Sequence, residues 1–206
     1  MRRALGLMAL LFLAGCATSP KSRFYALEPV PGQRIADSVS GPPIVVDAVH
    51  LPDVLDRLPL VRRAGSTQLQ ISETDRWAAP LDGMSRRVLA WDLAARLPAG
   101  LVVAPDAPKP PGAVRGLVVS VEEFDADAAG QVRLDAVWTL LAGSPQKRVI
   151  ERRETILVGG ADRFASEPAA MSRALGLLAD RIAGTLRAEP HLASSEAFGP
   201  SRGSRF

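Results

Sequence analysis

Residues 117–122 read LVVSVE and residues 132–140 read VRLDAVWTL, and these two runs decide the fold. Apolar and polar residues alternate in both, which is the period of a strand with one face on a core. Ala129-Gly130 supplies a turn between them, residues 143–145 supply another, and residues 149–158 make a third strand. This pattern predicts an antiparallel β-meander with one buried face.

Two helices are predicted beside the meander. The first has Pro80 in its first turn, where a proline loses no hydrogen bond, and ends before Pro98. The second is capped by Ser166 and ends at Pro190. Both carry an apolar stripe at helical spacing. The stripes are Leu81, Met84, Val88 and Trp91 in the first helix and Met171, Leu175, Leu178 and Ile182 in the second.

The first half of the chain predicts shorter strands. We expect strands at residues 24–27, 44–49 and 101–103, and a hairpin formed by residues 58–63 and 68–72. Together with the meander and the helices, these elements predict an α+β fold. Its sheet is mixed and mainly antiparallel, and its two helices pack on one face.

The N-terminus has the order of features typical of a bacterial lipoprotein. Arg2 and Arg3 are followed by an apolar run at residues 4–13, which is too short to span a bilayer. Leu13-Ala14-Gly15 then precedes Cys16, the only cysteine of the chain. We therefore expect a signal peptidase to recognise residues 13–15 and cut before Cys16, and the Cys16 thiol to carry lipid.

The lipid anchor sets the predicted domain organisation. Residues 1–15 are a signal peptide, residues 16–23 a lipidated tether, residues 24–189 a single domain and residues 190–206 a disordered tail. Several fatty-acyl chains such as palmitate on one residue hold a protein firmly, because each buried methylene contributes about 0.8 kcal/mol. Ala17 stands where an aspartate would favour the inner membrane, so we expect an outer-membrane anchor facing the periplasm.

The charge of the chain does not indicate a nucleic-acid partner. Arg2 and Arg3, both in the signal peptide, account for two of the three net positive charges. The other basic residues are scattered among acidic ones, as on an ordinary solvated surface. The sequence also has no glycine-rich phosphate-binding motif, so we expect no cofactor.

Catalytic residues are few. His191 lies in the predicted tail, and His50 has no histidine or cysteine at metal-ligand spacing. Asp53 and Asp56 lie beside Arg57 and are interpreted as turn residues with a local ion pair. A periplasmic hydrolase that uses His50 or the Asp53 and Asp56 pair stays open as an alternative. The sequence favours a protein that is not an enzyme and holds no metal.

A pair of glycines before the second predicted helix also has two interpretations. Gly159-Gly160 precedes Asp162 and could form an anion-binding nest of backbone N–H groups. The surrounding residues match no nucleotide-binding motif, so a loop between a strand and a helix is the better interpretation.

A series of short motifs resembles a known family. Cys16 is followed by FYAL at residues 24–27, VHLP at 49–52, LDR at 55–57, LVRR at 60–63 and RWAAPL at 76–81. In this order they resemble the PqiC/YmbA-like ABC-type transport auxiliary lipoproteins, over roughly residues 16–187. Ala79 departs from the pattern, which has a polar residue before the proline.

The resemblance implies a fold related to the N-terminal domain of TolB, assembly into a homo-oligomer, and a role in transport. The implied partner is a mammalian-cell-entry (MCE) domain subunit of a system that moves phospholipid or another hydrophobic compound between membranes and supports outer-membrane integrity. Cys16 transfers as the lipidated residue. The family motif is matched by Trp77, Pro80 and Leu81. Their implied role is to lock the turn into the first helix or to make a contact. No catalytic residue transfers.

Two mechanisms fit this implied role. A carrier of single lipids needs an enclosed apolar cavity, whereas an adaptor needs only exposed docking surfaces. A domain of this size, with 5% aromatic residues, is expected to fill its core with its own side chains. The sequence therefore favours an adaptor that docks through the faces or edges of the meander, with a direct lipid carrier as the alternative.

Overall fold

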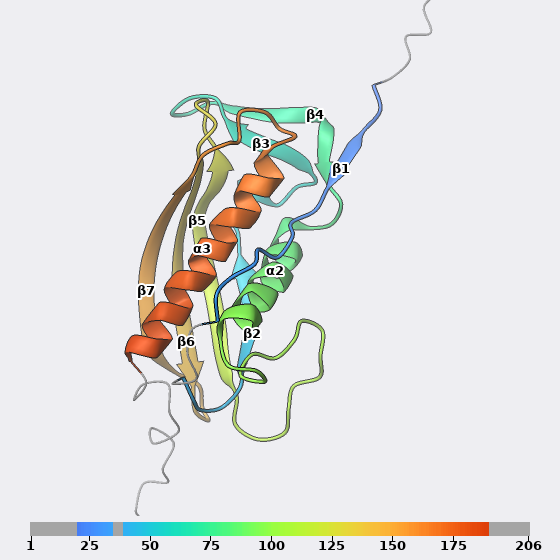
Figure 1. Cartoon of the computed structure of the whole chain (residues 1–206). Coiled ribbons are helices and arrows are strands. Elements are labelled where there is room, and N and C mark those ends of the chain that lie inside the picture. Colours follow the sequence, from blue (N-terminus) through green and yellow to red (C-terminus); the bar gives the residue numbers. More distant parts are fainter. Residues whose placement is uncertain (1–19, 35–38, 190–206) are drawn as a thin grey trace, which may run out of the picture.

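The computed structural model describes residues 20–34 and 39–189, which form one sheet with helices against it (Figure 1). The sheet has seven strands in the order β1-β4-β3-β5-β6-β7, and β2 pairs with β5 beside this path. The strands are β1 (Arg23–Tyr25), β2 (Ile44–His50), β3 (Pro59–Arg63), β4 (Leu69–Trp77), β5 (Arg115–Ala126), β6 (Val132–Ala142) and β7 (Lys147–Val158). The helices are the 3₁₀ helix η2 (Asp53–Leu55), α2 (Leu81–Arg96) and α3 (Glu167–Ala188).

The predicted meander is present as β5, β6 and β7, paired antiparallel throughout. Its central strand β6 alternates strictly, with every second residue buried. The buried face carries Val132, Leu134, Ala136, Trp138, Leu140 and Ala142. Full burial of one large apolar side chain contributes about 1.5–3 kcal/mol, so this alternation alone decides which face of the meander packs inward.

The first half of the chain completes the other edge of β5. β2 pairs parallel with residues 115–120 of β5, and β3 meets the far end of β5 where Arg62 lies opposite Ala126. β3 then pairs antiparallel with β4, and β1 joins β4 in parallel. The prediction of a mixed, mainly antiparallel sheet is confirmed.

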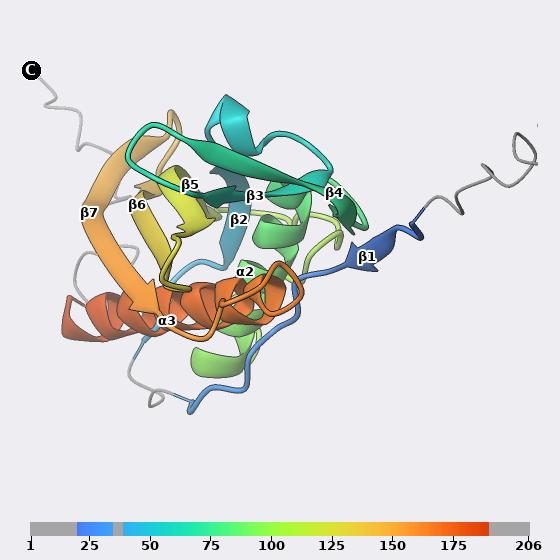
Figure 2. The same cartoon turned by 90° about the horizontal axis from the view of Figure 1, so that it is seen from above.

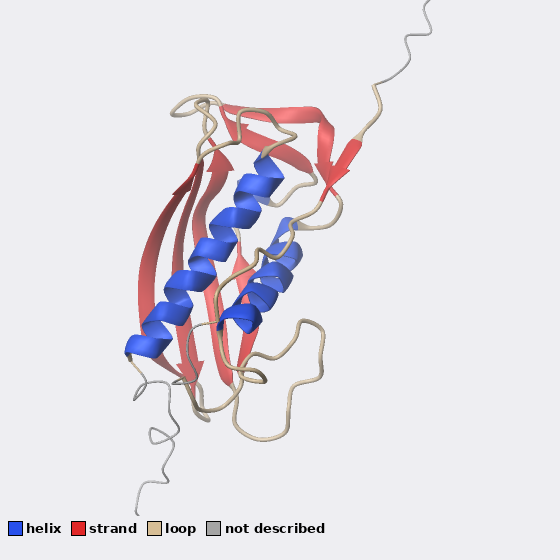
Figure 3. Cartoon of the chain, in the orientation of Figure 1, coloured by secondary structure: helices blue, strands red, loops and turns tan. Residues whose placement is uncertain are grey.

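Both helices lie on the same face of the sheet, as predicted (Figures 2 and 3). α2 packs mainly against β2 and α3, and α3 packs also against β5, β6 and β7. Their apolar stripes enter one continuous core that includes Val88, Leu93, Leu175 and Ile182. In the part of the chain that the structure describes, no helix is both long and apolar enough to cross a membrane.

Three local predictions need correction. Residues 101–103 form no strand but a single parallel bridge between Val102 and Ile44, because proline and glycine residues flank them. Pro80 lies just before α2 rather than in its first turn, and its carbonyl accepts the first helical bond from the Met84 N–H at 3.2 Å. Ser166 precedes α3, but its hydroxyl bonds the Asp162 carboxylate and the Arg163 backbone instead of capping the helix.

Two strand boundaries also differ from the prediction. β4 continues through residues 73–77, whose polar sequence shows no apolar alternation, because β1 pairs with its end. β1 itself begins at Arg23, inside the stretch that was expected to be tether.

Candidate functional site

The residues predicted for signal cleavage and lipidation, Leu13, Ala14, Gly15 and Cys16, lie outside the described residues. So does the predicted tail at residues 190–206, which contains His191. Their roles stay predictions.

The first described strand after the predicted anchor is held to the sheet by a buried carboxylate. Asp75 accepts hydrogen bonds from Arg23 Nη2 at 3.0 Å, Tyr25 Oη at 2.9 Å and Ser72 Oγ at 2.8 Å. Burial favours the protonated acid, but these donors outweigh it and hold the pKa of Asp75 below its usual value. Strand β1 is therefore fastened by side chains as well as by backbone pairing.

Residues 26–34, here called the strap, continue from β1 across α2 and α3 (Figure 1). The Val30 N–H donates to Asp92 Oδ1 at 2.7 Å, and Arg96 Nη1 donates to the Val30 carbonyl at 3.2 Å. Arg96 is buried and pairs with Asp180 at 2.5 Å. Burial raises the pKa of Asp92 to about 6. A charged network inside the domain thus holds the strap, the segment that follows β1.

The family-motif residues Trp77, Pro80 and Leu81 lie where β4 turns into α2. Trp77 is 3% exposed, and its backbone N–H donates to the Leu58 carbonyl at 2.7 Å. Leu81 is 4% exposed. Both side chains therefore belong to the core, whereas Pro80 is exposed, and the roles expected for this motif stay predictions.

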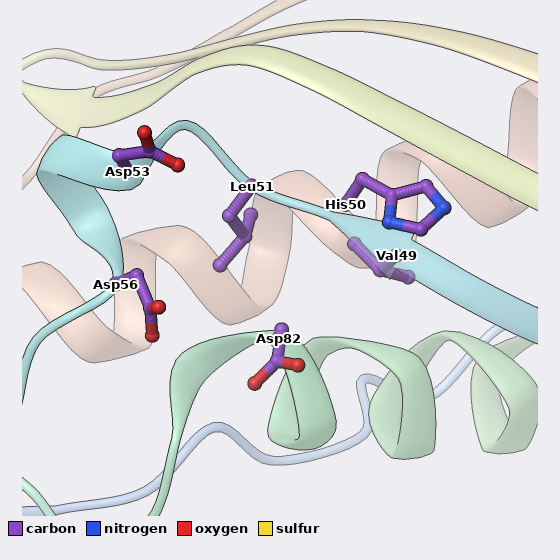
Figure 4. A pocket seen from close by; sticks show the side chains of 6 residues that line it. All are labelled: Val49, His50, Leu51, Asp53, Asp56 and Asp82. Atoms are coloured by element: carbon purple, nitrogen blue, oxygen red, sulfur yellow. The ribbon is translucent and has the colours of Figure 1, made fainter.

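Three aspartates line a hollow of about 190 Å³, here called the acidic hollow (Figure 4). Its walls are Val49, His50, Leu51, Asp53, Asp56 and Asp82. Val49 and His50 come from the end of β2, Asp53 comes from η2, and Asp82 comes from the first turn of α2. Within the described chain, none of the three aspartate side chains makes a hydrogen bond or an ion pair. The local ion pair expected for Asp53 and Asp56 with Arg57 is therefore absent.

The acidic hollow does not have the geometry of a catalytic or metal centre. The His50 ring points away from Asp53 and Asp56 along the strand (Figure 4). Among the residues that the structure describes, no three histidine, cysteine, aspartate or glutamate side chains are placed to hold a metal ion. Three carboxylates without a positively charged partner in the described chain attract cations.

Asp82 is the member of this group that the sequence analysis missed. It lies 26 residues after Asp56, at the start of a helix where an acidic residue has an ordinary role beside the helix dipole. No spacing signal could have found it, because only the packing of α2 against β2 brings it beside η2.

The loop after Gly159-Gly160 is occupied by the protein's own cations. Arg173 Nη2 donates to the Gly159 carbonyl at 2.8 Å, and Arg62 Nη1 donates to the Asp162 carbonyl at 2.9 Å. The Ala161 N–H donates to the Gly130 carbonyl at 2.9 Å and the Arg163 N–H to Ser166 Oγ at 3.2 Å, so these donors serve the protein itself and the segment fits a strand-to-helix loop.

The chain was compared with known proteins at the level of structure and of sequence. One solved structure, of an uncharacterized protein, is 21% identical, with a TM-score of 0.65, and the match covers 81% of this chain and 99% of that one. A second, of a protein from Xanthomonas campestris, is also 21% identical, with a TM-score of 0.57 and coverage of 80% and 95%. At this identity the likeness shows the fold alone. No curated protein matches the sequence.

The sequence also matches a family model, described as the ABC-type transport auxiliary lipoprotein component, over residues 25–183. The match includes β4, α2 and most of α3, and so it contains the motif at Trp77, Pro80 and Leu81. Since the match spans well over half of the chain, this protein belongs to the family of ABC-type transport auxiliary lipoproteins.

Proposed function

We propose that this lipoprotein is the outer-membrane adaptor of an MCE-type system that moves phospholipid or a similar hydrophobic compound between the two membranes. Acyl chains on Cys16 hold it to the membrane, and the domain faces the periplasm. It works without catalysis, metal or cofactor. It engages an MCE-domain subunit, and it does so as a homo-oligomer.

The observation that carries the adaptor mechanism is the filled interior of the domain. One continuous core joins residues of the sheet and of both helices. The hollow between Trp77, Phe124 and Met171 inside this core has a volume of only about 10 Å³. A hollow of that size is about one water molecule, so this part of the described core leaves no room for an acyl chain.

The attachment of β1 and of the strap to the rest of the domain supports the adaptor mechanism. β1, which follows the predicted tether, is tied to Asp75, and the strap, which follows β1, is tied to Asp92 and Arg96. A tie between membrane and domain suits an adaptor, which must hold a partner at a defined place. A soluble carrier that shuttles lipid would gain nothing from it.

The proposal is tested by purifying the full-length lipoprotein from gently solubilised envelopes and identifying the co-purified proteins and lipids by mass spectrometry. The variant Cys16→Ala is the matched control, because it removes the anchor and leaves the described domain unchanged. An MCE-domain protein is expected with the wild-type protein at near-stoichiometric amounts, without stoichiometric lipid.

Two results would contradict the proposal. Recovery of stoichiometric lipid by the domain, with no transporter partner, would make it a carrier. A mature wild-type protein whose N-terminal Cys16 carries no acyl mass would show that the anchor is not lipid on that residue.

A further inference from the structure

The strand β2 has one free edge. On one side it pairs with β5 from Ile44 to His50. On the other side, the described residues supply only the bridge to Val102, where the Ile44 N–H donates to the Leu101 carbonyl at 2.7 Å and the Val103 N–H donates to the Ile44 carbonyl at 2.9 Å. Beyond that bridge, no described strand pairs with residues 46–50 on this side.

Two hollows lie along this free edge and are here together called the groove, and the chain's own residues 103–107 and Lys109 line the second of them. Its far end is the acidic hollow, and its near end is a second hollow of about 290 Å³ lined by residues that include Val45, Val46 and Val103. α2 supplies one wall to both hollows, through Asp82 in the first and through Arg86 and Ala90 in the second. These three residues are spaced by four, so they lie on one face of the helix and form one continuous wall.

The dimensions of this groove suit a short extended peptide. Residues 46–50 of β2 extend over about 16 Å, at about 3.3 Å per residue. The helix wall from Asp82 to Ala90 extends over about 12 Å, at about 1.5 Å per residue. A strand of four or five residues matches these lengths, in line with the position that Val102 already occupies beside Ile44.

The charges in the groove select the occupant. At the near end the cations are neutralised, because Arg86 pairs with Asp106 at 3.3 Å and Lys109 with Asp47 at 3.0 Å. At the far end Asp53, Asp56 and Asp82 have no partner in the described chain. Three free carboxylates repel a phosphate headgroup and attract lysine or arginine.

We propose that the groove between β2 and α2 binds an extended peptide segment of a protein partner, which adds a strand to β2 and places a lysine or arginine in the acidic hollow. Backbone pairing along the free edge supplies affinity, and the carboxylates supply selectivity and orientation. This inference deepens the proposed function, on which the identity of the partner rests, because it names the surface that the partner engages.

Synthetic peptides test this proposal without knowledge of the partner. One seven-residue peptide alternates valine and threonine and ends in two lysines, and its twin ends in two glutamates. Both are titrated into the full-length lipoprotein in detergent, by fluorescence anisotropy. We expect the lysine peptide to bind about tenfold more tightly at low ionic strength, and the difference to shrink with added salt.

The triple variant Asp53→Asn, Asp56→Asn and Asp82→Asn is expected to abolish this preference. The matched control is Glu28→Gln, Glu73→Gln and Glu154→Gln, since these acids also have no side-chain partner in the described chain and the change in net charge is the same. Hydrogen exchange of the amides at residues 46–50 is expected to slow when the lysine peptide binds, as it does when a strand is added.

Three outcomes would overturn the inference. Equal loss of binding in the two triple variants would mean that only net charge matters. Unchanged amide exchange would mean attraction without strand pairing. Tighter peptide binding after deletion of residues 190–206 would make the chain's own C-terminal segment the occupant in place of a partner. The peptides can behave as expected while the envelope purification yields no MCE-domain protein. In that case the peptide-binding inference is confirmed and the proposed function is wrong.

Discussion

Arg62 joins the end of β3 to the start of α3 through buried contacts. Its guanidinium donates to the Ala161 carbonyl at 2.5 Å, pairs with Glu167 at 3.4 Å and lies 5.1 Å from the centre of the Phe164 ring. Burial raises the pKa of Glu167 to about 7, although Arg62 opposes this shift. Removal of the guanidinium would leave the buried Ala161 carbonyl without this donor and the buried Glu167 carboxyl with only the Ala126 N–H.

Arg62→Met is therefore expected to lower the free energy of unfolding by about 3–5 kcal/mol, measured by urea denaturation at neutral pH. Adding Glu167→Gln should recover part of the loss, because an amide is less costly to bury than a carboxylate. The control is Arg148→Met, which breaks the exposed pair with Glu151 and should cost no more than about 1 kcal/mol. A loss of similar size in the two single variants would contradict this account.

Asp92 makes the stability of the fold depend on pH. Its pKa is raised from 3.8 to about 6 by burial, so the folded protein binds more protons than the unfolded chain between these values. The contribution is present in full below pH 4 and is lost as the pH rises through 6. Asp92→Asn cannot ionise, and its carbonyl can still accept the Val30 N–H bond.

Relative to the wild type, Asp92→Asn should therefore gain about 1–3 kcal/mol of unfolding free energy between about pH 4 and pH 6. Denaturation curves at several pH values in this window measure the difference. Asp106→Asn serves as the control, since Asp106 is exposed and pairs with Arg86 and Arg87. A difference that does not change with pH would rule out titration of Asp92 as the cause.

At the scale of elements, the turn between β5 and β6 depends on a glycine. Gly130 has a φ of +78°, and an added Cβ would lie 2.9 Å from the Asp162 backbone nitrogen. Gly184 in α3 has open space around it. One glycine is thus required by the fold and the other is not.

Gly130→Ala is expected to lower the unfolding free energy by about 1–3 kcal/mol, because it combines left-handed strain with a backbone clash. Gly184→Ala is expected to raise it by up to about 1 kcal/mol, because alanine favours the helix. Thermal denaturation followed by circular dichroism compares the two. An equal effect of the two substitutions would show that Gly130 contributes nothing beyond local propensity.

An element could be predicted from the sequence where its own apolar pattern fixes it, and could not be predicted where a distant partner strand fixes it. The meander and both helices bury one regular face, so the period of apolar residues predicted them. The second half of β4 is polar, and it is a strand because β1 pairs with it from a distant part of the sequence. Residues 101–103 are apolar, but they reach β2 at one position only.

At the scale of the whole molecule, the filled core makes a direct prediction about lipid. Because the hollow inside the core holds about 10 Å³, the isolated Cys16→Ala protein should carry no stoichiometric phospholipid. Native mass spectrometry of the protein purified from the periplasm measures this directly. A one-to-one lipid complex that survives purification would require the core to open.

The sequence by itself determined the class of the protein. Apolar periodicity sufficed for the α+β fold, and local order predicts the lipobox at Cys16, since both are properties of neighbouring residues. The family motifs predicted the match that the comparison found over residues 25–183. None of these signals requires knowledge of which elements meet in space.

Only the tertiary structure decided where the charges and edges lie. Asp82 joins Asp53 and Asp56 because α2 packs beside β2, and Arg62 meets Glu167 because the sheet ends under the start of α3. Which edge of β2 stays free depends on the order of the strands in the sheet. Burial and charge compensation act between residues that are distant in the chain, so local sequence patterns cannot specify them.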